Sequence, residues 1–331
     1  MTDVPEGEDA APKTPRPDEG SFQGRMNAAR GELESQVAHA RVQFDETNER
    51  LKQRTGRDLI AAIAVGVGAG AIALVSLLFV KSLFTVIALL VSVFGVHELW
   101  RALRGGGRRV DLVPQLVAVV LILSAGYVAD LALHWVAVFA SIALIVVWRL
   151  LAQMAAQDAR AHREVFADAV VGAFVPLYVP FLASLALVLL RQDGGQWWIL
   201  AFLIVVVVSD TAAYASGLAF GRHPMAPRIS PKKTWEGFAG AAAAALAAGA
   251  LLAQFMLGLP WWSGLIFGAV ILLTATVGDL GESMIKRDLG IKDMSSALPG
   301  HGGVLDRLDS MLPSAVAALA LYFLLSPLAV P

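Results

Sequence analysis

Charged residues of both signs are concentrated between residues 279 and 310, in a half of the chain that is otherwise mostly apolar. Ten Asp, Glu, Lys and Arg residues and one His fall in these 32 positions. If the segment opens as a helix, Asp279, Glu282 and Lys286 lie on one face, at i, i+3 and i+7. Dense charge is costly beside a bilayer, so a purely structural loop seldom carries this much of it. We therefore expect the segment to perform metal-assisted phosphate chemistry.

A glycine-rich turn and two further carboxylates complete this segment. The glycines of Pro299-Gly300-His301-Gly302-Gly303 allow backbone N–H groups to turn toward an anion. Mg²⁺ prefers oxygen ligands, which carboxylates from two helices can supply together. The metal ligands that we expect are Asp279, Glu282, Asp306 and Asp309. The basic side chains that we expect to neutralise phosphates here are Lys286, Arg287 and Arg307.

A single carboxylate, Asp210, lies within an apolar stretch that has the length of a membrane span. Such a group costs several kcal/mol unless it is paired or hydrated. Asp210, Tyr214 and Gly217 share one helical face at i, i+4 and i+7. Asp210 therefore either faces a polar cavity, where it helps to position a metal or nucleotide, or pairs with a Lys or hydroxyl and only holds the bundle together.

Two lysines and two hydroxyls occur just before another predicted helix, in Ser230-Pro231-Lys232-Lys233-Thr234. Thr234 is placed to cap that helix, with Gly237 at the third position. A helix N-terminus together with ammonium groups is suited to bind phosphate. The alternative is that Lys232 and Lys233 are ordinary basic anchors at a membrane surface.

The composition predicts an all-α integral membrane protein. Of the 331 residues, 57% are hydrophobic and only 16% are charged. The absence of Cys excludes thiolate metal sites and disulfides, and no cleavable signal peptide is evident. Nine apolar segments are each about long enough to cross a ~30 Å hydrocarbon core. They are residues 59–79, 83–103, 112–131, 134–152, 168–190, 197–219, 235–257, 261–285 and 311–330, with a tight hairpin at Lys81-Ser82.

Basic residues predict how this bundle is oriented, because they are enriched on the cytoplasmic side of membrane proteins. With the N-terminus in the cytoplasm and nine crossings, 24 of the 26 Lys and Arg residues fall on the cytoplasmic side. Only Lys81 and Arg191 fall outside. The polar regions 221–234 and 286–310 then form a site that faces the cytoplasm, in the cell (inner) membrane.

The N-terminal region differs from the membrane domain expected over residues 58–331. Residues 1–24 are rich in Pro, acidic and small residues, which is typical of a disordered tail. Residues 25–57 carry an apolar stripe that predicts a cytoplasmic amphipathic helix, on the membrane or on the protein itself. A self-associating coiled coil is the alternative.

At its polar motifs the chain resembles the phosphatidate cytidylyltransferase (CDP-diacylglycerol synthase) family. The family signature is matched, with its spacing, by Ser283, Arg287, Lys292-Asp293, Pro299-Gly300-His301-Gly302-Gly303 and Asp306-Arg307-Leu308-Asp309. The upstream elements around Asp210 and from Ser230 to Gly237 also look like the family's. The resemblance is strong over residues 205–312, which would hold the catalytic elements. It does not include residues 1–57.

The resemblance implies that CTP and phosphatidate react to give CDP-diacylglycerol and pyrophosphate, in phospholipid biosynthesis. It implies Mg²⁺ as cofactor, with a second metal or a monovalent cation left open. The catalytic residues would be Asp279, Lys286, Arg287, His301 and Asp306. The substrate-binding residues would be Asp210, Ser230, Lys232, Lys233, Thr234, Ser283, Gly302, Gly303 and Arg307. His301 would contact phosphate or order its loop, the alternative being a catalytic base.

Three other functions fit parts of this sequence. A cytidylyltransferase for another lipid phosphate, such as a prenyl or ether lipid, shares the same chemistry. An ion-coupled transporter explains buried Asp210 and Asp279 but not the glycine turn. A purely structural scaffold fits least.

The expected partners are CTP, phosphatidate and membrane lipid, with no nucleic acid. The small residues from Ala239 to Ala250 pack helices either in a homodimer or within one bundle.

Overall fold

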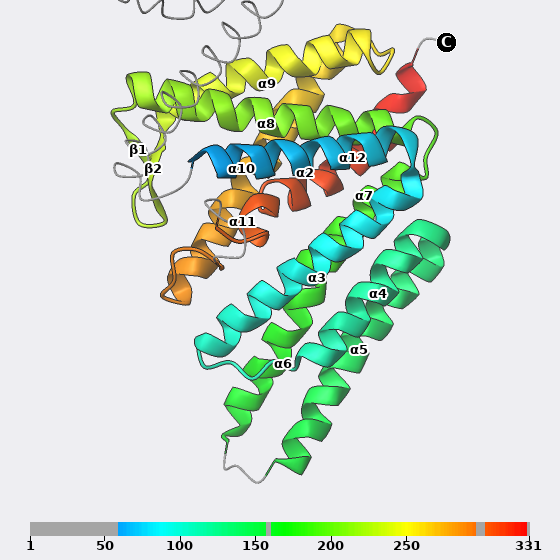
Figure 1. Cartoon of the computed structure of the whole chain (residues 1–331), viewed down its shortest axis with the longest axis vertical. Coiled ribbons are helices and arrows are strands. Elements are labelled where there is room, and N and C mark those ends of the chain that lie inside the picture. Colours follow the sequence, from blue (N-terminus) through cyan, green and yellow to red (C-terminus); the bar gives the residue numbers. More distant parts are fainter. Residues whose placement is uncertain (1–58, 157–159, 296–301, 330–331) are drawn as a thin grey trace, which may run out of the picture. The chain divides into compact units, whose positions relative to one another are not determined.

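The computed structural model describes residues 59–156, 160–295 and 302–329 (Figure 1). The expected tail over residues 1–24 and the amphipathic helix over residues 25–57 lie outside the described residues. So do His301 and the five residues before it, 296–300.

Helices make up most of the described chain. They are α2 (Leu59–Phe79), α3 (Lys81–Gly105), α4 (Leu112–Val128), α5 (Leu131–Ala155), α6 (His162–Pro176), α7 (Leu182–Leu190), α8 (Gly195–Phe220), α9 (Trp235–Phe255), α10 (Trp261–Asp288), α11 (Leu305–Leu308) and α12 (Met311–Leu325). Each of the nine predicted apolar segments coincides with a helix or with a continuous helical run. The chain does turn tightly near Lys81, where only Val80 separates α2 from α3. The described parts of the two helices do not pack along each other, so the turn is not the hairpin that was expected.

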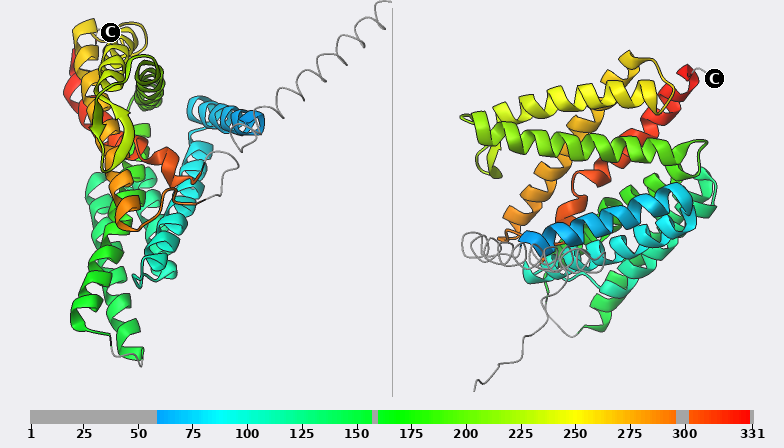
Figure 2. Two further views of the ribbon diagram at one scale, coloured as in Figure 1. Left: turned by 90° about the vertical axis from the view of Figure 1, so that its left-hand side faces the viewer. Right: turned by 45° about the horizontal axis from the view of Figure 1, so that its top comes forward.

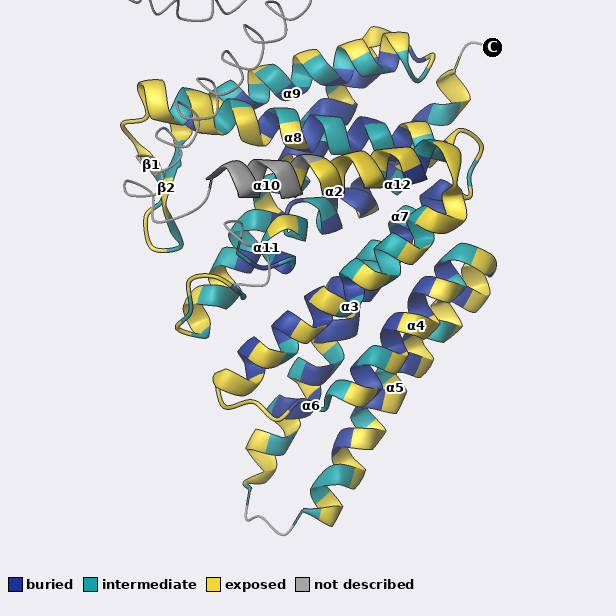
Figure 3. Ribbon diagram, in the orientation of Figure 1, coloured by how far each residue is buried: buried dark blue, intermediate teal, exposed yellow. Residues whose placement is uncertain are grey.

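The protein is a helical membrane protein. In the described part of the chain, seven helical stretches are long and apolar enough to cross a bilayer, and α4 and the Gly70–Phe79 part of α2 are shorter apolar helices. Helices suit this setting because they satisfy all of their backbone hydrogen bonds internally. Exposed residues recur along α3, α4 and α5 (Figure 3), and many of them are large and apolar, such as Val120 and Phe139. These faces are suited to contact lipid.

The helix predicted over residues 168–190 is interrupted. The α6 helix passes into a π-helical turn, η1 (Leu177–Phe181), before α7 begins. Pro180 has no N–H to donate to the carbonyl four residues earlier, so an α-helix cannot continue unchanged through it. A wider turn accommodates the missing hydrogen bond, and such turns are common at functional sites.

The polar motifs are carried by α8, β2, α10 and α11, and α9 and α12 pack against these elements. The α8 and α9 helices lie side by side, and α10 packs across α9 and against α12 (Figures 1 and 2). The contact between α9 and α10 is very close: a Cβ on Gly249 would lie 2.2 Å from the carbonyl oxygen of Gly264. The small-residue run Ala239 to Ala250 therefore packs within one bundle, as one of the two expected alternatives proposed.

One small sheet adds to the helices, so the expectation of a purely α-helical chain was wrong in this detail. Strands β1 (Pro224–Ala226) and β2 (Ser230–Thr234) pair antiparallel between α8 and α9. Pro231 lies in β2, in a two-stranded sheet where both strands are edges and a missing N–H is tolerated. The hairpin holds the two lysines of β2 at the start of α9.

Candidate active site

A cavity of about 300 Å³ unites three of the predicted motifs. Asp210 comes from α8, Lys232, Lys233 and Thr234 come from β2, and Asp279 comes from α10. Apolar side chains, such as Phe238 and Leu272, form much of the rest of its wall, together with Ser209, Tyr214 and Thr276. Asp210 therefore does face a cavity with polar residues, which favours a role for it in binding. The cavity has the charge and the donors to hold a phosphorylated ligand.

An ion pair crosses this cavity between segments 46 positions apart. The Nζ atom of Lys233 lies 2.5 Å from Oδ2 of Asp279, and both side chains remain partly exposed, at 26% and 29%. The hydroxyl of Ser283 donates to Oδ1 of the same Asp279, at 3.4 Å. Because the pair is solvent-accessible, Lys233 can exchange its carboxylate partner for a ligand phosphate at small cost.

Thr234 caps α9, as its position predicted. Its Oγ1 accepts a hydrogen bond from the backbone N–H of Gly237, at 3.1 Å. Glu236, in the first turn of α9, accepts from the N–H groups of Arg222 and His223, at 3.1 and 3.2 Å. These bonds tie both ends of the hairpin to α9 and place the positive end of the helix dipole beside the lysines.

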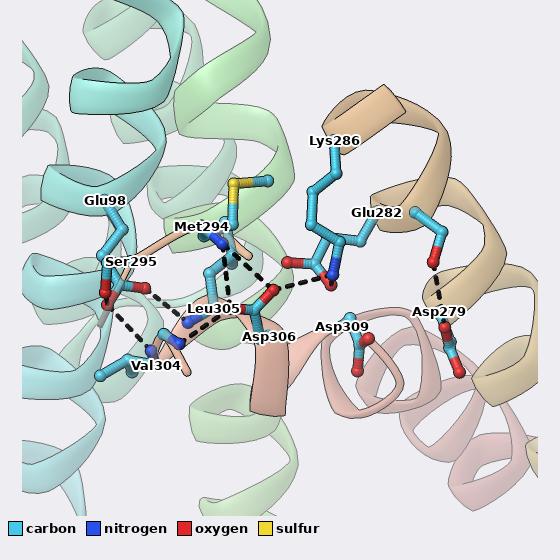
Figure 4. A network of polar contacts seen from close by, with 12 residues as sticks. Glu98, Asp279, Glu282, Lys286, Met294, Ser295, Val304, Leu305, Asp306 and Asp309 are labelled. Atoms are coloured by element: carbon cyan, nitrogen blue, oxygen red, sulfur yellow. Dashed lines mark hydrogen bonds and ion pairs between the residues drawn. The ribbon is translucent and has the colours of Figure 1, made fainter. Parts of the chain in front are cut away.

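A second polar cluster centres on Lys286. Its Nζ lies 2.8 Å from Oδ1 of Asp306 and 3.1 Å from Oε2 of Glu282 (Figure 4). Glu282 is fully buried, and the side chains of Lys286 and Asp306 are only 14% and 10% exposed. The ammonium group thus joins α10 to the start of α11. The i, i+3 and i+7 spacing predicted that Asp279, Glu282 and Lys286 share one face of α10. It did not predict that Asp306 would be the partner of Lys286.

Asp309 completes the cluster. A Cβ on Gly278 would lie 2.1 Å from the carbonyl oxygen of Asp309, so glycine is what lets this backbone approach α10. The second oxygen of Glu282, Oε1, is buried and has no hydrogen-bond partner among the described residues. The carboxyl group of Asp309 is close enough to interact with it. In Figure 4, the carboxylates of Asp306, Asp309 and Asp279 lie in this order from left to right.

Asp306 is held in place by backbone donors as well as by Lys286. Its Oδ2 accepts hydrogen bonds from the N–H groups of Gly303, at 2.8 Å, and Met294, at 3.0 Å (Figure 4). The glycine turn was expected to offer its N–H groups to a bound anion. In this structure the N–H of Gly303 binds the protein's own carboxylate, and Gly302 adopts a positive φ of 84°. The turn thus orients Asp306.

Glu98 is a site residue that the sequence argument missed. Although it lies within the apolar helix α3, its carboxylate accepts hydrogen bonds from the N–H groups of Val304, at 2.9 Å, and Leu305, at 2.8 Å, and from the hydroxyl of Ser295. Glu98 is only 3% exposed. It caps α11 and so fixes the segment that carries Asp306. The sequence did contain a signal for Glu98, because a carboxylate within an apolar helix is as unusual at this position as at Asp210.

The remaining predicted residues lie at the edges of these two clusters. Arg287 is exposed, and its Nε donates to the carbonyl oxygen of Ile229, at 3.3 Å, which links α10 to the hairpin next to Ser230. Arg307 is also exposed and interacts electrostatically with Asp210. The structure therefore places Arg287 beside the hairpin, and Arg307 close enough to Asp210 for their charges to interact.

The four expected metal ligands suit Mg²⁺ in chemistry, since all are carboxylates. The described residues contain no group of three or more His, Cys, Asp or Glu side chains arranged to hold a metal ion. Two ammonium groups compensate the charge here, because Lys233 pairs with Asp279 and Lys286 pairs with Asp306. The buried, unpartnered oxygen of Glu282 beside Asp309 is nevertheless a setting that favours a cation.

The comparisons with known proteins agree with one another, because each of them finds a cytidylyltransferase. A sequence model described as "Cytidylyltransferase family" matches residues 60–325. A phosphatidate cytidylyltransferase of Mycobacterium bovis is 39% identical over 274 residues, which are 80% of this chain and 88% of the relative. One of Mycobacterium leprae is 39% identical over 285 residues, 82% and 90% of the two chains. One of Brucella suis is 43% identical over 150 residues, 45% and 54% of the two chains.

Proposed function

The chain belongs to the cytidylyltransferase family, and from this membership we infer that it transfers the cytidylyl group of CTP to phosphatidate. The products are CDP-diacylglycerol and pyrophosphate, and the reaction belongs to phospholipid biosynthesis. The aligned region includes most of this chain and most of the Mycobacterium relatives, so the similarity extends over the membrane domain and is not limited to its polar motifs.

One observation carries the mechanism: a single cavity brings together Asp210, Lys233 and Asp279 from α8, β2 and α10. The reaction joins two anions, so the main task of the site is to neutralise charge. The cavity offers Lys232 and Lys233 beside the N-terminus of α9, where triphosphate oxygens are favoured. We assign CTP to this cavity.

The chemical step is a displacement at phosphorus. A phosphate oxygen of phosphatidate forms a bond to the α-phosphorus of CTP, and the bond from that phosphorus to the pyrophosphate oxygen breaks. Because the attacking phosphate is already anionic near neutral pH, no strong general base is needed. We propose that Lys286, Arg287 and Arg307, which α10 and α11 carry, hold the lipid phosphate and the departing pyrophosphate. Asp306 and Glu282 keep Lys286 in place until phosphate arrives.

We propose that Mg²⁺ is the cofactor and that Asp279 and Asp306 hold it, with Asp309 and Glu282 beside them. When bound, Mg²⁺ supplies the positive charge that a transferring phosphoryl group requires. The carboxylate donor set and the unpartnered oxygen of Glu282 support this assignment. With a cation on the two aspartates, Lys233 and Lys286, which now pair with them, would be available to phosphate oxygens. Whether a second metal or a monovalent cation takes part is a further question for metal titration.

We also propose that the site faces the cytoplasm from the inner membrane, with nine crossings and a cytoplasmic N-terminus. The support is the predicted placement of 24 of the 26 basic residues on one side. CTP is a cytoplasmic substrate, whereas phosphatidate keeps its acyl chains in the bilayer, so a site at this boundary meets both. A homodimer is compatible with this arrangement, and the oligomeric state of the purified protein would test it.

The function is tested with purified protein, labelled CTP and Mg²⁺, by measuring pyrophosphate release and lipid-bound label. We expect both to require phosphatidate and to appear in equal amounts. Label on a prenyl or ether lipid phosphate, with none on phosphatidate, would favour a related transferase. CTP that is not consumed with any lipid would contradict the proposal and favour a transporter.

A further inference from the structure

One exposed face of α3 changes from apolar to basic toward the end of the helix. Its apolar part consists of side chains at helical spacing, each of them 44–54% exposed: Leu83, Val86, Leu90 and Phe94. The same face continues with His97, Arg101 and Arg104, which are exposed as well. Because α3 is long and apolar enough to cross a bilayer, the change after Phe94 indicates where this face leaves the hydrocarbon. His97 and the two arginines then lie at the depth of the lipid headgroups.

These three side chains and Trp100 line an open hollow of about 400 Å³. The indole is fixed in place, because its Nε1 donates a hydrogen bond to the carbonyl oxygen of Val110, at 2.9 Å. The Cζ atom of Arg104 lies 5.2 Å from the centroid of the Trp100 ring, and the ring of His97 lies 5.5 Å from the same ring. A cation–π attraction at this distance holds the guanidinium group over the indole. The hollow therefore has a rigid aromatic wall with a positive charge upon it.

The two arginines of this hollow form no ion pair with any residue that the structure describes. Arginines with a structural role behave differently here: Arg149 and Arg160 pair with the buried carboxylate of Asp168, at 3.3 and 3.4 Å. Arg101 and Arg104 are three positions apart on one helical face, where like charges repel each other. An anion bound between them would remove this repulsion, so the hollow has the charge for an anionic ligand.

We propose that this hollow binds the phosphate group of an anionic phospholipid of the surrounding bilayer, with Arg101 and Arg104 as its ligands. A phospholipid has its groups in the order that the face of α3 requires. Its phosphate meets guanidinium groups, which bind phosphate through several N–H donors at once, and its glycerol region lies against Trp100. Its acyl chains follow the apolar side chains of Phe94 and Leu90. A soluble phosphate ester would gain nothing from this apolar part, so the occupant is a lipid.

This lipid site is separate from the proposed active site, because the hollow shares no lining residue with the cavity that holds Asp210. The two are nevertheless connected through α3. Glu98 follows His97 directly in the chain but is buried, and its carboxylate accepts the hydrogen bonds that fix α11. The lipid phosphate and the start of α11 therefore lie within about one helical turn of each other along α3. A lipid bound in the hollow would hold α3 at the depth at which Glu98 meets α11.

The experiment measures how strongly brominated lipids quench the fluorescence of Trp100 in the purified full-length protein in vesicles. Bromine quenches an indole only at short range, and the contribution of Trp100 is the difference between the wild type and Trp100→Phe. Phosphatidylglycerol and phosphatidylcholine, both brominated on acyl carbons close to the glycerol, are compared at equal fractions of the bilayer. We expect phosphatidylglycerol to be preferred at Trp100 about thirtyfold, which corresponds to about 1 kcal/mol for each arginine.

Arg101→Gln/Arg104→Gln should abolish this preference, so that both lipids quench Trp100 equally. The matched control Arg108→Gln/Arg163→Gln removes the same charge from two exposed arginines that do not line the hollow, and it should keep the preference. Each preference is a ratio within one variant, measured with and without Trp100→Phe after thermal unfolding has confirmed the fold. Equal quenching by both lipids in the wild type would overturn the inference. An unchanged preference in Arg101→Gln/Arg104→Gln, or an equal loss in the control, would also overturn it.

Discussion

The ammonium group of Lys286 lies 2.8 Å from Oδ1 of Asp306, although the two residues are 20 positions apart. This pair joins the end of α10 to α11, and it is nearly closed to solvent. It brings the two halves of the charged segment 279–310 together into one cluster. Lys286 is therefore both a structural link and a phosphate ligand in the proposed mechanism.

Lys286→Met should consequently reduce both stability and activity. It leaves the carboxylates of Glu282 and Asp306 without their shared cation, and removing one partner of a buried ion pair costs about 3–5 kcal/mol. We expect a lower melting temperature and a fall in kcat of at least about tenfold. The double variant Lys286→Met/Asp306→Asn should recover part of the stability and none of the activity. Recovery of activity would argue that Lys286 has only a structural role.

Glu98→Gln should loosen the segment that carries Asp306. Val304 and Leu305 donate to different oxygens of Glu98, so Gln can accept only one of the two hydrogen bonds, and its amide nitrogen leaves the other donor without an acceptor. We expect a loss of about 2 kcal/mol in unfolding free energy and faster hydrogen exchange at residues 302–306. Asp130→Asn is a suitable control, since Asp130 caps α5 through the N–H of Leu133, away from the site. Equal exchange rates at residues 302–306 in Glu98→Gln and the wild type would show that α3 does not hold this loop.

Gly249→Ala should destabilise the contact between α9 and α10. The new methyl group would meet the carbonyl oxygen of Gly264 at 2.2 Å, so the helices must separate at a cost of about 1–3 kcal/mol. Gly68→Ala is the matched control, because nothing lies within 4 Å of its Cβ position. A better helix former at Gly68 should be neutral or slightly stabilising. Equal melting temperatures for the two variants would contradict the close packing.

The metal proposal predicts that activity is lost in a chelator and is restored by Mg²⁺. Asp309→Asn should raise the Mg²⁺ concentration needed for half-maximal rate, because it removes one charge beside the unpartnered oxygen of Glu282. The mutation should leave the KM for CTP unchanged at saturating Mg²⁺. An activity that survives exhaustive chelation would contradict the proposal, and an unchanged Mg²⁺ requirement in Asp309→Asn would exclude that residue as a ligand.

Much of this architecture could be predicted from the sequence, because apolar length identifies membrane helices independently of their partners. Each predicted segment is helical, and Thr234 caps α9 as expected. The number of crossings stays a prediction, since α4 and the Gly70–Phe79 part of α2 are shorter than the seven helical stretches that are long enough to span a bilayer. Helical spacing also predicted which face of α10 carries Asp279, Glu282 and Lys286.

The tertiary partners could not be predicted in this way. Spacing within α10 says nothing about the approach of Lys233 from β2 to Asp279, or of Asp306 to Lys286. Glu98 was not predicted as a site residue, because its partners in the loop lie more than 190 positions away in the sequence. The π-helical turn at Pro180 and the hairpin β1–β2 depend on local backbone geometry that an apolar pattern does not encode. The role expected of His301 stays a prediction.

The most direct test of the account is the synthesis of CDP-diacylglycerol from CTP and phosphatidate by purified Asp279→Ala and Asp306→Ala proteins in Mg²⁺. Both aspartates lie in the clusters that the structure brings together from α10, β2 and α11. We predict that each variant inserts in the membrane and folds but forms no detectable product, whereas the wild type converts both substrates. Full activity in either variant would contradict the assignment of the site.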